Sequence, residues 1–197
     1  MAGFKYLWKN RAKFPIGSIN FFRGWGKRLF SFPELLSRNF RRSSLTNKGA
    51  RIAETAEIGK AEIKGPAKLL SIGKETFLGR VKIALYDEVI IGERVCINDG
   101  VEILTASHDV ADPEWKHVKS KIIIEDYVWI GTGAMILPGV VLGRGSVVGA
   151  RAVVSKSVPS NAIVVGNPAR AVNRRRCDEL NYNPCEFLAA NRAWLMG

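Results

Sequence analysis

An aliphatic residue recurs every six positions through most of the chain after about residue 50. The longest unbroken series is Ile124, Ile130, Ile136, Leu142, Val148 and Val154, and an earlier one is Ile91, Ile97 and Ile103. A period of six suits neither a helix of 3.6 residues per turn nor a simple alternating strand. It suits short strands separated by turns and stacked as a solenoid, with three units per triangular coil. We therefore expect Ile124 to stack on Leu142. Ile130 should stack on Val148 in the same way.

A second position of the repeat is small or β-branched. Four residues after the aliphatic positions stand Val95, Val101, Ser107, Val128, Ala134, Val140, Ser146, Ala152 and Val158. Glycine often follows the aliphatic residue directly, as expected where the chain turns a corner. The coils before residue 91 are less regular, because Lys64 breaks the series and the register slips between Leu78 and Leu85. The repeats predict an all-β fold, a prism of stacked coils over residues 50–172.

Three longer motifs accompany the repeats: DYVWIG at 126–131, GARAVVSK at 149–156 and GNPAR at 166–170. Together with the repeats, they resemble the hexapeptide-repeat acyltransferases, in particular the sugar and exopolysaccharide O-acetyltransferases related to maltose and galactoside acetyltransferases. The resemblance covers about residues 50–172. It implies a left-handed parallel β-helix, a homotrimer, and acetyl-CoA bound as acyl donor in the groove between neighbouring subunits.

The repeat is interrupted once, between Ile103 and Ile124, an interval three residues longer than three repeats. The loop 106–120 within it holds both histidines of the chain, His108 and His117. Loops on rigid scaffolds commonly carry functional residues. His108 matches the position of the family's catalytic histidine, and an imidazole is suited to take a proton from a sugar hydroxyl near neutral pH. We predict that His108 is the general base.

The resemblance also implies contacts with acetyl-CoA. Trp129 matches an aromatic residue near the thioester; Gly131, Thr132, Gly149 and Ala150 match backbone that lines the pantetheine slot; and Ser155, Lys156 and Arg170 match the nucleotide end. On the acceptor side, the predicted contacts are Arg80, Asp109 and His117, with a loop-structural role as the alternative for Asp109. No metal site is expected, because the histidines have no closely spaced third ligand. Cys96 is predicted to be a small buried core residue rather than a nucleophile.

The two ends of the chain fall outside the repeats. Residues 1–49 form a basic, aromatic-rich extension: eleven basic residues and one acidic residue before position 51 give +10 of the chain's net charge of +12. Its prolines and glycines predict one or two short helices. Such a segment can meet an anionic membrane, or its aromatic rings can pack on the main domain. Residues 173–197 are predicted to form a helical cap, mostly helical over 178–194, that protects the last coil.

These features favour an acetyl-CoA-dependent O-acetyltransferase acting on a saccharide or polysaccharide intermediate. An alternative is an acetyltransferase for an amino sugar, serine or an antibiotic. From another class, a non-catalytic basic scaffold or a nucleic-acid-binding protein remains, but neither explains the loop histidine, so we expect no nucleic-acid partner. Three cysteines without a CxxC pair, together with the lack of a recognisable secretory signal, indicate the cytoplasm, with possible contact at the inner membrane face.

Overall fold

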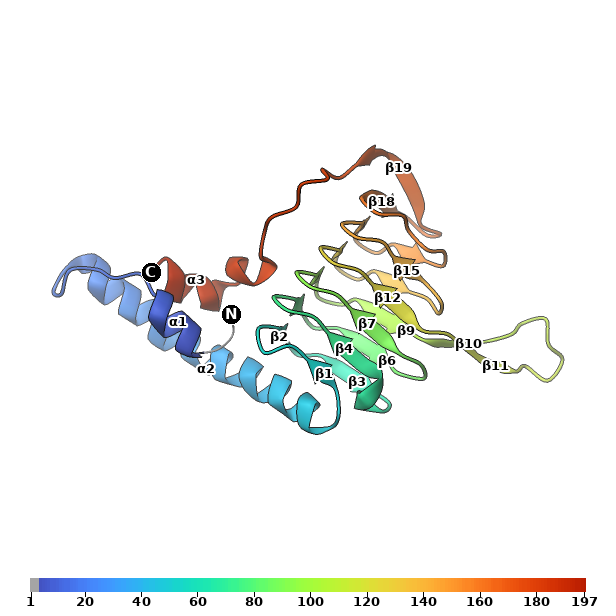
Figure 1. The fold of residues 1–197 in the computed structure, drawn as a ribbon, viewed down its shortest axis with the longest axis horizontal. Helices are drawn as coiled ribbons and strands as arrows, with labels where there is room; N and C mark the ends of the chain where they lie inside the picture. Colours follow the sequence, from blue (N-terminus) through green and yellow to red (C-terminus); the bar gives the residue numbers. More distant parts are fainter. Residues whose placement is uncertain (1–3) are drawn as a thin grey trace.

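A computed structural model describes residues 4–197; residues 1–3 of the predicted N-terminal extension lie outside the described residues. The centre of the molecule is the predicted parallel solenoid, with three faces (Figure 1). Sheet A contains β1 (Arg51–Ile52), β4 (Leu70–Ile72), β7 (Val89–Ile91), β12 (Ile122–Ile124) and β15 (Val141–Leu142). Sheet B contains β2 (Glu57–Ile58), β5 (Phe77–Leu78), β8 (Cys96–Ile97), β13 (Trp129–Ile130), β16 (Val147–Val148), β18 (Ala162–Val165) and β19 (Arg170–Arg175). Sheet C contains β3 (Glu62–Lys64), β6 (Lys82–Ala84), β9 (Glu102–Leu104), β14 (Met135–Ile136) and β17 (Val153–Val154).

The predicted stacking between coils is confirmed. Ile124 aligns with Leu142 on sheet A, and Ile130 aligns with Val148 on sheet B. The inward aliphatic residues of both series are at most 2% exposed, and burying one such side chain fully contributes about 1.5–3 kcal/mol. The small residues four positions later fill the corners, except Ser107, which is exposed in the insertion. One apolar core therefore runs the length of the solenoid.

The early coils are regular too, with a longer period. The sequence suggested that Lys64 breaks the series of inward aliphatic residues. Instead, Ile63 takes the inward position, and Ile63, Ile83 and Ile103 align on sheet C at intervals of 20 residues. Lys64 is the exposed neighbour of the inward Ile63, and Leu85 is a buried residue in the turn after β6. An extra residue or two in the corners moved the aliphatic position away from the strict six-residue count.

The N-terminal segment forms α1 (Phe4–Asn10) and a single long helix, α2 (Ile19–Asn47). The prediction of short broken helices is therefore wrong for α2, which has 29 residues and continues through Gly24, Gly26 and Pro33. Ser18 caps it, because its side-chain oxygen accepts a hydrogen bond from the backbone N–H of Phe21 at 3.1 Å. Packing of one face against the rest of the chain stabilises the helix despite these unfavourable residues.

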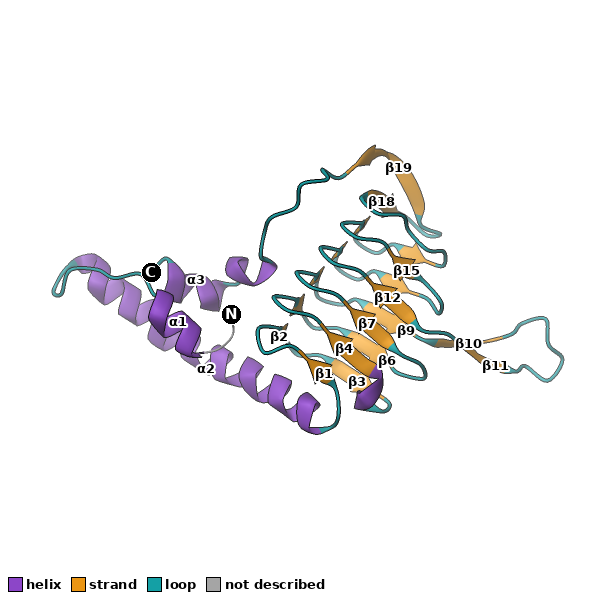
Figure 2. Cartoon of the chain, in the orientation of Figure 1, coloured by secondary structure: helices purple, strands orange, loops and turns teal. Residues whose placement is uncertain are grey.

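A short C-terminal helix is present, as predicted, but the predicted extent over 178–194 and the predicted place over the last coil are wrong. Only the 3₁₀ turn η2 (Pro184–Phe187) and α3 (Ala189–Leu195) are helical within 178–194. The last coil is closed by β19, which pairs antiparallel with β18. The chain then returns along the solenoid, and α3 packs on α1 and α2 beside the first coils (Figures 1 and 2). A second small core results, built from Leu7, Leu35, Ala190, Ala193 and Trp194.

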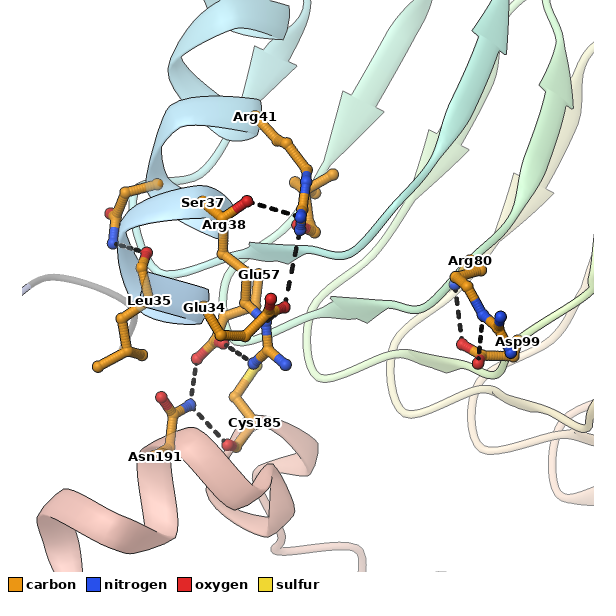
Figure 3. Close-up of polar contacts among 12 residues, drawn as sticks. Glu34, Leu35, Ser37, Arg38, Arg41, Glu57, Arg80, Asp99, Cys185 and Asn191 are labelled. Atoms are coloured by element: carbon orange, nitrogen blue, oxygen red, sulfur yellow. Dashed lines mark hydrogen bonds and ion pairs between the residues drawn. The ribbon is translucent and has the colours of Figure 1, made fainter. Parts of the chain in front are cut away.

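A buried carboxylate joins this helical layer to the solenoid (Figure 3). Glu57 on β2 is completely buried; its Oε2 accepts from Arg38 Nη1 of α2 at 2.9 Å, and its Oε1 accepts from the side-chain amide of Asn191 on α3. The same amide of Asn191 also donates to the backbone carbonyl of Cys185 at 2.8 Å. Burial raises the pKa of Glu57, although the hydrogen bonds from Asn191 and Arg38 act in the opposite direction. Three distant parts of the sequence meet at this one side chain.

Candidate active site

The interruption in the repeats is a β-hairpin that projects from the solenoid at the corner between sheets C and A (Figure 1). Its strands are β10 (Ala106–His108) and β11 (His117–Lys119), paired antiparallel with His108 opposite His117. Ile91 aligns with Ile124, 33 residues later, whereas the next coil on this face takes 18 residues, so the insertion amounts to 15. This length matches the predicted loop 106–120, although the part next to the solenoid forms two paired β-strands rather than an irregular loop.

Trp115 of the hairpin contacts His108 with both its ring and its backbone carbonyl. The two rings are stacked with centroids 3.8 Å apart and an interplanar angle of 15°. His108 Nδ1 lies 2.7 Å from the backbone carbonyl oxygen of Trp115. Because a carbonyl can only accept, Nδ1 carries the proton, and Nε2 of the neutral ring keeps its lone pair. Trp115 has a φ of 51°, a left-handed conformation that is uncommon for a bulky residue. The sequence places Trp115 in the loop but gives no sign of this role.

The other predicted acceptor residues of the hairpin differ in their surroundings. His117 packs edge to face on His108 and on Tyr86, with centroids 5.2 and 5.1 Å apart. The carboxylate of Asp109 accepts a hydrogen bond from the backbone N–H of Ala111 at 2.9 Å, which is the loop-structural role considered from the sequence. His117 and Tyr86 thus form a wall beside His108, while Asp109 shapes the turn.

The predicted nucleotide-end residues come together near the last coils. Ser155, Lys156 and Arg170 line one groove of about 360 Å³. Ser155 and Lys156 follow β17, so they lie at the same corner between sheets C and A as the hairpin, two coils beyond β9. With strands about 4.8 Å apart, this separates the levels by about 10 Å along the edge. The edge therefore offers an imidazole at one level and two cations further along.

The predicted slot residues lie on a different edge. Gly131, Thr132, Gly149 and Ala150 form the corners between sheets B and C, and Trp129 points outward from sheet B with 44% of its surface exposed. A Cβ at Gly131 would lie 2.7 Å from the backbone nitrogen of Ala150, so stacking of adjacent coils requires glycine there. A single chain does not bring this edge to the hairpin.

Arg80 lies at the same corner as these slot residues, near the other end of the solenoid. Its backbone N–H and its Nε donate to the two carboxylate oxygens of Asp99 at 2.9 and 2.8 Å (Figure 3). These hydrogen bonds lower the pKa of Asp99. The sequence did not indicate that Asp99 pairs with Arg80. This ion pair offsets the positive charge that Arg80 was predicted to offer to an acidic acceptor.

The prediction that Cys96 is a buried core residue is wrong. Cys96 lies on the outer side of sheet B and is only partly buried, because inward and outward residues alternate along β8 and the inward one is Ile97. Together with Trp129, Tyr182 and Arg176, it lines a hollow of about 310 Å³ under the C-terminal segment. Burial raises its pKa to about 11, which leaves the thiol protonated near neutral pH. It is therefore a poor nucleophile, as expected, although not a core residue.

Arg176 fixes that C-terminal segment. One of its nitrogens donates to the backbone carbonyl of Tyr127 at 2.8 Å, and another lies 2.7 Å from the hydroxyl of Tyr182.

No group of three or more histidine, cysteine or acidic residues suited to a metal occurs among residues 4–197. Over the same residues, no helix has the length and apolar character needed to cross a membrane.

Known proteins share both the repeats and the fold. Residues 121–156 match the family described as bacterial transferase hexapeptide (six repeats). WcaF of Escherichia coli, named for an acetyltransferase role in colanic acid biosynthesis, is 34% identical over 129 residues, which cover 64% of this chain and 70% of WcaF. A protein of Schizosaccharomyces pombe, also named for an acetyltransferase, is 40% identical over 92 residues; these span 44% of this chain but only 43% of that protein.

Among solved structures, a hexapeptide-repeat acetyltransferase from Vibrio cholerae, complexed with acetyl-CoA, is similar with a TM-score of 0.60. It is 26% identical, and the match covers 88% of this chain and 98% of that one. The solenoid has the left-handed β-helix fold that the sequence predicted.

Proposed function

We propose that this chain, which belongs to the hexapeptide-repeat acetyltransferases, transfers the acetyl group of acetyl-CoA to a hydroxyl group of a saccharide. The observation that carries the proposal is the state of His108. Its Nδ1–H is committed to the carbonyl of Trp115, so Nε2 is free to accept a proton. A base with a fixed tautomer is what a weakly nucleophilic sugar hydroxyl requires.

In the proposed reaction, the acetyl group passes directly from the thioester to the hydroxyl group, with His108 as the base. His108 Nε2 takes the hydroxyl proton while the sugar oxygen forms a bond to the acetyl carbon. The bond from that carbon to sulfur breaks, and His108 returns the proton to the leaving thiolate. Backbone N–H groups beside the reacting carbon would stabilise the transient oxyanion. Lys156 and Arg170, at the groove further along the edge, suit the phosphates of the donor.

The active unit in this proposal is a homotrimer. His108 and Trp129 belong to different edges of one solenoid, so a site that contains both needs a neighbouring copy. Mixing and reassembling inactive His108→Ala and Trp129→Ala chains should restore about a quarter of the wild-type activity, since a quarter of random interfaces would pair two intact residues. No recovery in verified mixed trimers would contradict shared sites.

The direct test of the base replaces each histidine of the hairpin in turn. His108→Ala should lower kcat by about 10²- to 10⁴-fold with little change in acetyl-CoA affinity. His117→Ala, directly opposite on the partner strand, is the matched control and should lose less than about tenfold. Equal losses in both variants, or full turnover in His108→Ala, would contradict the assignment.

The acceptor is proposed as a saccharide or polysaccharide intermediate, with Arg80, Asp109 and His117 as candidate contacts. The name of WcaF supports this class, and an amino sugar, serine or an antibiotic is the alternative. A panel of sugars and nucleotide sugars incubated with acetyl-CoA, with thiol release and product mass measured, separates these acceptors. The three cysteines are unpaired, which supports action in the cytoplasm.

A further inference from the structure

The long helix α2 carries an apolar stripe on its surface. Its members Phe22, Gly26, Leu29, Pro33, Leu36 and Phe40 follow one another at intervals of four or three residues. Such spacing places them along one face of a helix. The four large side chains of the stripe, those of Phe22, Leu29, Leu36 and Phe40, are 55–77% exposed. Ile19 and Phe30, 73% and 91% exposed, widen it.

The stripe lies on the face of α2 that the chain itself does not use. The residues buried in α2 are Gly24, Arg28 and Leu35, spaced so that they share the opposite face. In the C-terminal half of α2, Arg38 reaches Glu57 of the first coil. Contacts with the solenoid and with α3 therefore occupy the inner faces, and the stripe lies on the exposed face of the helix. Figure 2 shows α1, α2 and α3 gathered at one end of the molecule.

The charge around the stripe has one sign. Exposed cations on this part of the chain are Lys9, Lys13, Arg23, Lys27 and Lys48. The first fifty residues contain a single acid, Glu34. Its carboxylate is occupied by Arg38 at 2.9 Å and lies 3.7 Å from Arg41. Lys27 also donates to the backbone oxygen of Gly197 at 2.8 Å. The surface of α2 thus combines exposed aromatic and aliphatic side chains with an excess of positive charge.

We propose that the apolar stripe of α2 is a docking surface for membranes that contain anionic lipid. A bilayer of this kind satisfies both features, because the apolar side chains enter the boundary of the acyl chains and the cations meet the headgroups. A second copy of the helix would bring together the cations that lie beside the stripe in each copy. The single acid of this region, Glu34, is already paired with Arg38 and would not offset their repulsion. Nucleic acid would leave the apolar side chains in water. This surface is independent of the proposed acetyl transfer.

The experiment measures sedimentation of the full-length protein with vesicles. One set contains phosphatidylcholine alone, and the other contains about 25% phosphatidylglycerol. The wild-type chain should bind the anionic set, and less so at high salt. Phe22→Ser/Leu29→Ser/Phe40→Ser should lower the partition constant by about 1000-fold or more, since full burial of each of the three side chains changes it by about tenfold or more.

A second variant tests the charge. Arg23→Glu/Lys27→Glu should lower binding to the anionic vesicles by at least about 25-fold and flatten its salt dependence, because each cation contributes about fivefold. The control is Val110→Ser, which removes a 93% exposed apolar side chain from the hairpin instead and should bind like wild type. Circular dichroism confirms that each variant is folded.

Four outcomes would overturn the proposal. The first would be that the wild-type chain fails to bind anionic vesicles, and the second that it binds duplex DNA in preference to them. The third and fourth concern the triple variant. The folded triple variant binds the vesicles as well as wild type. Without lipid, the triple variant has a lower molecular mass than wild type, which would assign the stripe to contacts between copies of the chain.

Discussion

Removing the buried carboxylate of Glu57 should release the helical layer from the solenoid. In Glu57→Ala, the guanidinium of Arg38, whose side chain is 12% exposed, loses its buried partner, and the Asn191 amide loses one of its two acceptors. Breaking a buried ion pair by removing one member costs about 3–5 kcal/mol when the remaining charge has no other partner. Arg38 keeps its ion pair with Glu34 at 2.9 Å, so we take the lower end of this range, about 3 kcal/mol. We expect a loss of this size in the free energy that holds α2 and α3 to β2.

The thiol of Cys185 reports this release directly. Cys185 is completely buried beside Asn191, so alkylation requires the layer to open. A loss of about 3 kcal/mol should accelerate its alkylation by about 10²-fold. Glu62→Ala is the matched control, since this acid lies on β3, the next strand along the chain, and its side chain is 53% exposed; it should change the rate less than about threefold. Similar rates for the two variants would refute the reasoning.

Two further variants separate charge from shape at Glu57. Arg38→Met/Glu57→Leu removes both charges and should remain within about 1–2 kcal/mol of wild type. Glu57→Gln keeps the shape and removes the titration. Because burial raises the pKa of Glu57, the folded state holds the proton more tightly, so wild type should gain stability relative to Glu57→Gln as the pH falls through the raised pKa. A relative gain on raising the pH would contradict the stated direction.

Other positions give equally specific expectations. Lys156→Ala and Arg170→Ala should each raise the KM for acetyl-CoA by about tenfold with kcat nearly unchanged, measured by initial rates; a donor lacking the 3′-phosphate shows which cation meets that group. Gly131→Val should lower Tm by several degrees, because a Cβ there would meet the next coil at 2.7 Å; an unchanged melting curve would show that the corner can relax. At pH 8, iodoacetamide should modify the exposed Cys177 well before Cys96, because burial raises the pKa of Cys96 to about 11. Peptide mass spectrometry measures the order of modification.

The solenoid could be predicted because its physics is local and repeated. Each coil buries the same kind of residue at the same spacing, so Ile130 and Val148 could be paired from their separation alone. The 15-residue insertion and its histidine were visible as a break in that pattern. The longer early coils could not be recognised in this way. An extra residue or two at the corners breaks the six-residue spacing without changing which side chain points inward.

The rest depended on contacts between residues far apart in the sequence. The length of α2 could not be predicted from its own glycines and proline, because Leu35 is stabilised by Trp194 and Leu7. The hold of Trp115 on His108 depends on the backbone direction in a turn, to which composition gives no guide. The position of α3 followed from Glu57 and Asn191, a pair 134 residues apart.

The helical layer joins the first and last segments of the chain, and this sets the order in which the protein can be completed. During synthesis, Leu7 and Leu35 leave the ribosome long before Ala193 and Trp194, with which they form one core. The coils between them can stack as they emerge, whereas α1 and α2 must wait until α3 has been synthesised. A chain truncated before residue 189 should therefore retain its solenoid and leave its first two helices without a partner.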